Sequence, residues 1–176
     1  MRNLPVSCAV CAASLGYHNA EAKGLTLFKW KVSISGDQQP DVFECLGLTL
    51  LTMMARTGSS KALVIPTPEP GRDPTAQAGD KALHTWILNG DIQYSSSGAV
   101  ARVIPAVKLL YRVIDRAEAD KLSESFVDGA PDISFPVSEI SAVEAGLAQS
   151  NSLLPPNERS FKGWTVGLLT KWRDTV

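Results

Sequence analysis

The sequence predicts an α+β fold, with a mostly antiparallel sheet and about three helices packed on it. The stretches that predict strands and those that predict helices do not alternate regularly along the chain. A protein built of βαβ units would show regular alternation of strands and helices. An Asn-Gly pair between two apolar runs indicates an antiparallel hairpin. The chain has 176 residues, 44% of them hydrophobic, so it can bury a sizeable core. We expect residues 1–176 to form a single domain.

The N-terminal residues predict a tight turn, a loop and a strand. Cys8-Ala-Val-Cys11 indicates a turn that presents two thiols, and residues 17–24 are polar enough for a loop. From Phe28 to Ile34 apolar residues alternate with lysine and serine, which is the pattern of a half-buried strand. Since a metal-type cysteine pair lies so close to the first residue, we expect the chain to be the C-terminal part of a longer protein.

A helix is predicted to begin after Asp41. The Asp41 carboxylate can accept a hydrogen bond from a free backbone N–H, and Glu44 completes an acidic capping box. Gly58 is a natural residue for the C-terminal cap. The helix is nearly all apolar, so we expect it to be well buried. Its apolar stripe comprises residues 42, 45, 46, 50, 53 and 54.

The middle of the chain predicts a strand at Ala62–Ile65, a loop and a hairpin. Residues 66–80 contain four prolines and two glycines, which favours a flexible, exposed loop. Leu83–Leu88 is the first hairpin strand, and Asn89-Gly90 is the predicted turn. Residues 92–94 would begin the return strand.

The C-terminal half predicts a central strand at residues 107–114, because both of its faces are largely apolar. Asp115 and Glu118 then predict a second capped helix. A short strand follows at Ile133–Phe135. Ser138 is expected to cap a last helix, which faces the core with residues 140, 143 and 147. A Leu-Leu-Pro-Pro corner then precedes a closing strand at 164–168.

Charge and composition exclude several classes of protein. The formal net charge is −1 and the isoelectric point is about 6.1, so a broad basic surface for direct nucleic-acid binding is not expected. The longest apolar runs are too short to span a membrane, and no signal peptide is recognisable. We therefore expect a cytoplasmic or nuclear protein. Three cysteines, an odd number, argue against a disulfide framework.

The Cys8/Cys11 pair is the candidate metal site. A two-residue spacer lets both thiolates reach one tetrahedral Zn²⁺, but the pair supplies only two of four ligands. His18 and Cys45 would complete a Cys₃His set within this chain, or the other ligands lie in a region outside it. Unliganded structural thiols and a redox pair are the remaining alternatives.

Cys45 is the candidate nucleophile, although its position on an apolar helical stripe favours a small core residue. His84 lies in a predicted strand and is expected to be structural. The two histidines have no serine or cysteine at a recognisable elbow, so no catalytic triad is predicted and the catalytic residues stay unknown.

Several stretches, in this order along the chain, resemble the HECT-like ubiquitin-conjugating enzyme (E2)-binding family. The most specific is the ending from Ser150-Asn-Ser-Leu-Leu-Pro-Pro156 through Trp164 to Leu169. The others are residues 8–16, 27–34, 83–89 with 94–97, and 106–112. The resemblance covers essentially the whole chain, and it corresponds to the C-terminal half of a typical member.

The resemblance implies that the chain binds a ubiquitin-charged E2 and acts as an E3 ubiquitin-protein ligase. The implied substrate is a protein such as a cyclin. Members of the family also contain another cysteine-rich segment, which implies that zinc ligands beyond Cys8 and Cys11 lie outside this chain. The family is further tied to mRNA 3′-end processing through a protein partner, so the alternative function is a non-catalytic protein that binds or stabilises a partner.

The mechanism expected from this resemblance is scaffolding. A HECT ligase forms a ubiquitin thioester on a cysteine of its C-terminal lobe, whereas this chain has no cysteine after Cys45. We therefore expect the chain to place E2 and substrate side by side, which makes aminolysis of the E2 thioester effectively unimolecular.

Overall fold

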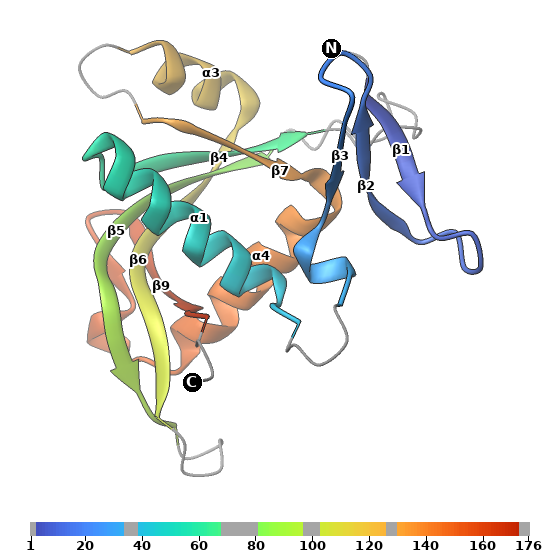
Figure 1. The fold of residues 1–176 in the computed structure, drawn as a ribbon. Coiled ribbons are helices and arrows are strands. Elements are labelled where there is room, and N and C mark those ends of the chain that lie inside the picture. Colours follow the sequence, from blue (N-terminus) through green and yellow to red (C-terminus); the bar gives the residue numbers. More distant parts are fainter. Residues whose placement is uncertain (1–2, 34–38, 68–80, 97–102, 126–129, 173–176) are drawn as a thin grey trace.

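The computed structural model describes residues 3–33, 39–67, 81–96, 103–125 and 130–172, and it contains a larger and a smaller β-sheet (Figure 1). The larger sheet has six strands in the order β7-β4-β5-β6-β9-β8. All its neighbouring strands are antiparallel except β4 and β7. The strands are β4 Lys61–Thr67, β5 Lys81–Tyr94, β6 Ile104–Asp115, β7 Asp132–Pro136, β8 Ser160–Phe161 and β9 Trp164–Thr170. The predicted α+β class with a mostly antiparallel sheet is confirmed.

The smaller sheet is antiparallel and has three strands in the order β1-β2-β3. They are β1 Asn3–Ser7, β2 Ser14–Asn19 and β3 Gly24–Leu27. Figure 1 shows this sheet standing to one side of the larger one, with the short 3₁₀ helix η1, Lys29–Lys31, leading from it toward α1. The prediction that residues 17–24 form a loop is wrong for residues 17–19, because Tyr17 and His18 pair with both neighbouring strands.

Two helices cover one face of the larger sheet. They are α1, Val42–Thr57, and α4, Val137–Ser152, and they enclose the main core against β4, β5, β6 and β9. Residues Ile140, Val143 and Leu147 of α4 are buried there, as predicted. The third helix, α3 Arg116–Glu124, covers a smaller cluster on the opposite face through Ala119 and Leu122. None of the helices in the described ranges is long and apolar enough to cross a membrane.

The predicted caps hold for the first two helices. Asp41 Oδ1 accepts from the Glu44 N–H at 2.7 Å, and the Asp41 N–H donates to Glu44 Oε2 at 2.9 Å. Gly58 ends α1 in the left-handed region, with φ 72°. Asp115 Oδ1 likewise accepts from the Glu118 N–H at 2.7 Å. These interactions satisfy donors that a helix N-terminus otherwise leaves free.

Two expectations about the helices are corrected. Pro136, not Ser138, precedes the first residue of α4, and no side chain caps that end. Only Leu46, Gly47 and Leu50 of α1 are fully buried, so its burial is less extensive than predicted. Part of α1 borders a pocket instead of the core, which explains the difference.

The C-terminal corner fastens α4 to β9. Ser150 Oγ donates to the Leu147 carbonyl at 2.8 Å and accepts from the Leu168 N–H at 2.9 Å. Asn151 Nδ2 donates to the carbonyls of Arg159 and Val166. The polar residues of this corner therefore satisfy backbone groups, which fits a structural role.

The predicted hairpin at Asn89-Gly90 is wrong, because β5 runs without a turn from Lys81 to Tyr94. The register with β6 shifts on both sides of Asn89, and the Asn89 side chain accepts from the Asp91 N–H at 2.9 Å. A Cβ on Gly90 would lie 2.6 Å from Leu51 Cδ2 of α1. Glycine here gives the end of the Leu51 side chain room against the strand, and it does not form a turn.

The strand predicted at residues 28–34 is also wrong. β3 ends at Leu27, residues 29–31 form η1, and Ile34 lies outside the described residues. Phe28 and Trp30 stack on each other, with ring centroids 5.1 Å apart, and Trp30 stacks on Phe135 at 5.2 Å. The two-residue spacing of Phe28 and Trp30 therefore reflects the stacking of their rings, not the alternation of a strand. The other strands at 62–65, 107–114, 133–135 and 164–168 are confirmed. The loop predicted at 66–80 is wrong for residues 66 and 67, which belong to β4, and its residues 68–80 lie outside the described residues.

Candidate functional site

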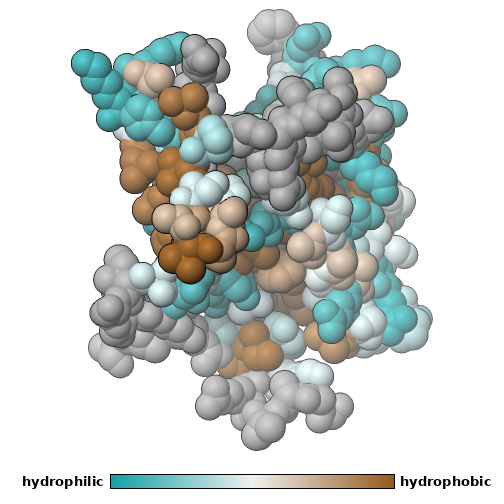
Figure 2. Space-filling model, turned by 90° about the vertical axis from the view of Figure 1, so that its right-hand side faces the viewer, coloured by the Kyte–Doolittle hydropathy of each residue, from teal (hydrophilic) through white to brown (hydrophobic). Residues whose placement is uncertain are grey.

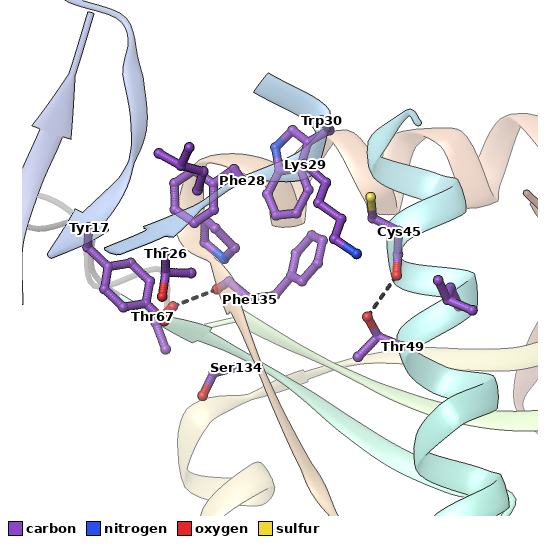
Figure 3. A pocket seen from close by; sticks show the side chains of 13 residues that line it. Tyr17, Thr26, Phe28, Lys29, Trp30, Cys45, Thr49, Thr67, Ser134 and Phe135 are labelled. Atoms are coloured by element: carbon purple, nitrogen blue, oxygen red, sulfur yellow. Dashed lines mark hydrogen bonds between the residues drawn. The ribbon is translucent and has the colours of Figure 1, made fainter. Parts of the chain in front are cut away.

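A pocket of about 440 Å³ lies where the three-stranded sheet, η1, α1 and the ends of β4 and β7 meet (Figure 3). Such a volume is typical of small-molecule sites. The lining residues are Tyr17, Thr26, Leu27, Phe28, Lys29, Trp30, Cys45, Leu48, Thr49, Thr67, Ser134, Phe135 and Pro136. The pocket thus joins segments far apart in the sequence, and no local pattern predicted it.

Aromatic rings form much of the pocket wall. Tyr17 meets Phe28 edge to face, with centroids 6.3 Å apart, and the stack continues through Trp30 to Phe135. This ladder connects β2 of the smaller sheet with β7 of the larger one. Aromatic pairs of this kind add about 0.5–1.5 kcal/mol each beyond the burial of their area. The ladder both shapes the pocket and attaches the smaller sheet.

Several polar side chains line the pocket, and two of their hydroxyls donate to backbone carbonyls, whereas the buried Trp30 Nε1 has no hydrogen-bond partner among the described residues. The Thr49 hydroxyl donates to the Cys45 carbonyl at 2.7 Å, and the Thr67 hydroxyl donates to the Phe135 carbonyl at 3.1 Å. Lys29 is the single charged residue in the lining. Figure 3 shows its side chain extending from η1 toward Cys45 and Thr49, beside the Phe135 ring.

Cys45, the candidate nucleophile, borders this pocket on α1 and is partly buried. Burial raises the pKa of its thiol, and the nearby Lys29 charge only partly opposes that rise. Cys45 is therefore protonated near neutral pH and is a weak nucleophile. Neither histidine, both within the described ranges, forms a hydrogen bond with it.

The Cys8/Cys11 segment forms a turn, as predicted, and this turn connects the strands β1 and β2, which were not predicted. The Cys8 N–H donates to the Ala13 carbonyl, and the Ala12 N–H donates to the Cys8 carbonyl, each at 2.9 Å. Hydrogen bonding from the backbone of Cys11, and then of Val10, lowers the pKa of the Cys8 thiol. Two thiols on one tight turn, one of them with a lowered pKa, fit half of a tetrahedral zinc site.

The in-chain Cys₃His set is not brought together. His18 lies on β2, paired with Leu4 and Leu25, while Cys45 lies on α1 at the pocket. Across the residues that the structure describes, no three His, Cys, Asp or Glu side chains are close enough to hold a metal ion. The half-site stays a prediction.

His84 is buried in the larger sheet, away from the pocket. Its ring meets Trp164 edge to face at 4.7 Å, and its Nδ1 lies 3.3 Å from an Arg112 nitrogen. Burial, and then the charges of Arg112 and Lys61, lower the pKa of His84 to about 4. A neutral histidine packed between strands fits the predicted structural role.

The smaller sheet presents an exposed apolar surface that the sequence did not predict. Leu4 is opposite His18, and His18 is opposite Leu25, so these side chains share one face; Leu27 lies two residues beyond Leu25. Leu4, Val10, Leu25 and Leu27 are 44, 95, 59 and 42% exposed. Figure 2 views the side of the molecule on which this sheet lies, and hydrophobic side chains gather there. We call these four residues the apolar face. Exposed patches of this kind mark interaction sites.

Comparisons with known proteins give one match. The chain matches the family model described as HECT-like ubiquitin-conjugating enzyme (E2)-binding over residues 1–166, essentially its full length. No curated protein and no solved structure gave a significant match. The family model spans both sheets, the pocket and the cysteine turn. The chain therefore belongs to the HECT-like ubiquitin-conjugating enzyme (E2)-binding family.

Proposed function

We propose that the chain binds a ubiquitin-charged E2 and promotes ubiquitin transfer to a protein substrate as a scaffold. The family match over residues 1–166 carries this proposal. In the transfer, the amine of a substrate lysine attacks the thioester carbonyl on the E2. An isopeptide bond forms, the carbon–sulfur bond breaks and the E2 cysteine leaves as a thiol. By holding the E2 and the substrate together, the chain raises the effective concentration of the lysine at the thioester. This form of catalysis needs no nucleophile from the chain.

The state of Cys45 supports scaffolding over a thioester on the chain. Its thiol is protonated and partly buried, whereas a thiol that accepts ubiquitin must be accessible as a thiolate. The test uses E1, a panel of E2s, ubiquitin and the chain, without reductant. We expect that a variant with Cys8, Cys11 and Cys45 all replaced by alanine still makes E2 discharge faster than it is without the chain. A reductant-sensitive ubiquitin adduct on the wild-type chain, lost in this variant, would overturn scaffolding.

The apolar face is the E2 contact surface that we propose. Its leucines and Val10 are exposed on the strands and at the tip of one sheet, and exposed apolar patches are typical of protein–protein contact surfaces. Leu25→Asp and Val10→Asp are expected to weaken E2 binding at least about tenfold. Leu153→Asp, at a site 49% exposed after α4, is the matched control and should leave binding unchanged. Equal affinity of all three variants would place the E2 elsewhere.

A non-catalytic partner-binding role is the second candidate. The apolar face favours it equally, since such a surface requires a protein partner but no chemistry. Affinity purification separates the two: recovery of an mRNA 3′-end-processing factor, with no stimulated E2 discharge, supports this second role. Recovery of charged E2s and a cyclin-type substrate supports the first.

A further inference from the structure

The pocket has the size and walls of a site for a small ligand. Its volume of about 440 Å³ and its aromatic rings from Phe28, Trp30 and Phe135 suit a flat or branched apolar group. Trp30 lies in η1, Phe28 directly precedes η1 and Phe135 lies in β7, so the rings of two segments stack on each other. The walls are therefore largely preformed, which reduces the entropy lost on binding.

The charge of the pocket is distinctive. Among its 13 lining residues only Lys29 is charged, and none is Asp, Glu or Arg. Lys31, two residues along η1, forms an ion pair with Glu139 at 2.9 Å, whereas Lys29 forms none with any described residue. A ligand that covers an ammonium group is disfavoured unless it supplies the opposite charge. The pocket therefore selects for an anion.

The neutral polar groups add to this selectivity. The hydroxyls of Thr49 and Thr67 already donate to backbone carbonyls. The lining also contains the hydroxyls of Tyr17, Thr26 and Ser134 and the buried indole N–H of Trp30, which has no hydrogen-bond partner among the described residues. The Trp30 N–H is therefore a neutral donor in addition to the charged Lys29, whose side chain Figure 3 shows extending over the pocket. These donors beside aromatic walls fit one anionic group on an apolar body.

We propose that this pocket binds an organic carboxylate whose body is aromatic or branched aliphatic. The carboxylate pairs with Lys29, and the body packs against Phe28, Trp30 and Phe135. Two sources offer this chemistry: a free small acid, and the C-terminal residue of a polypeptide. The proposal does not rest on E2 binding, which we assign to the apolar face, although Leu27 belongs to both sites.

The test is a titration of the full chain with 3-phenylpropionate and with a tetrapeptide, acetyl-Gly-Ser-Gly-Phe, with a free carboxylate. The amides of both compounds are the ligand controls. Binding of either acid, at least about tenfold tighter than its amide, is expected, because the charge-assisted bond to Lys29 is lost in the amide. Tighter binding of the free acid indicates a small-molecule ligand, and tighter binding of the peptide indicates a chain terminus.

Two variants locate the site. Lys29→Gln should weaken binding of the acid at least about tenfold, while Lys121→Gln, at an exposed lysine of α3, should leave it unchanged. Thr49→Phe, which fills the pocket and keeps Lys29, should abolish binding. Circular dichroism checks that each variant is folded. Absence of binding by both acids, or equal binding to wild type and Lys29→Gln, would overturn the proposal.

Discussion

The two sheets of this protein differ in how they are stabilised. The six-stranded sheet is covered by α1 and α4 and holds the core, with Leu46, Leu147 and Leu169 fully buried. In the three-stranded sheet no hydrophobic side chain within the described ranges is fully buried, and Leu4, Leu25 and Leu27 are exposed to solvent. The smaller sheet is attached through the aromatic ladder that ends on Phe135. We conclude that the larger sheet provides most of the stability of the fold, and that the smaller sheet provides an exposed apolar surface.

The largest expected effect on stability is in the core. Leu147→Ala, on α4, should lower the free energy of unfolding by about 2–5 kcal/mol, because it removes a fully buried side chain and leaves a cavity. Leu25→Ala on the apolar face is the matched control, with an expected change within about 0.5 kcal/mol. Urea unfolding measures both. Similar losses in the two variants would show that the smaller sheet shares the core's stability.

A pH effect of up to about 3 kcal/mol is expected from His84, since one pKa unit corresponds to about 1.4 kcal/mol. Its folded-state pKa of about 4 lies below the ordinary value of 6.5. As pH falls, the unfolded chain therefore takes up this proton first. The stabilisation is complete above pH 6.5 and is lost as pH falls toward 4.

The control for that prediction is His84→Gln, which cannot titrate in this range. Unfolding measured between pH 7 and 4 should show a steeper loss of stability in the wild type than in the variant. Parallel curves would mean that the pKa of His84 is not lowered in the folded protein.

A smaller, local effect is expected when the ladder is cut. Trp30→Ala removes the ring between Phe28 and Phe135. Amide hydrogen exchange in residues 3–27 should become about tenfold faster, which corresponds to about 1.4 kcal/mol of local stability, while β5 and β6 keep their protection. Uniform acceleration across both sheets would contradict the separation of the two regions.

The zinc prediction concerns only the smaller sheet. Cys8 and Cys11 supply two of four ligands, so the purified chain is expected to contain well under one zinc per molecule. Elemental analysis measures the ratio. One zinc per chain, retained in His18→Ala and Cys45→Ala but lost in Cys8→Ala, would show that the turn binds zinc without those partners.

Local chemistry explains which parts of the fold the sequence predicted. Capping by Asp41 and Asp115 depends on residues three positions apart, and the apolar β6 carries its own pattern. The errors arose where contacts between distant residues matter: Gly90 lies against the Leu51 side chain of α1, and Trp30 stacks on Phe135 of β7. For the same reason the sequence predicted the cysteine turn but not the pocket, which unites residues 17 to 136.

The central claim, that the chain is an E2-binding scaffold, is tested most directly by single-turnover discharge of ubiquitin-charged E2s to lysine. We expect at least one E2 of the panel to discharge faster as the chain concentration rises, until the rate saturates. The Leu25→Asp variant should not produce this acceleration. No binding and no acceleration with any E2, by a folded wild-type chain, would contradict it.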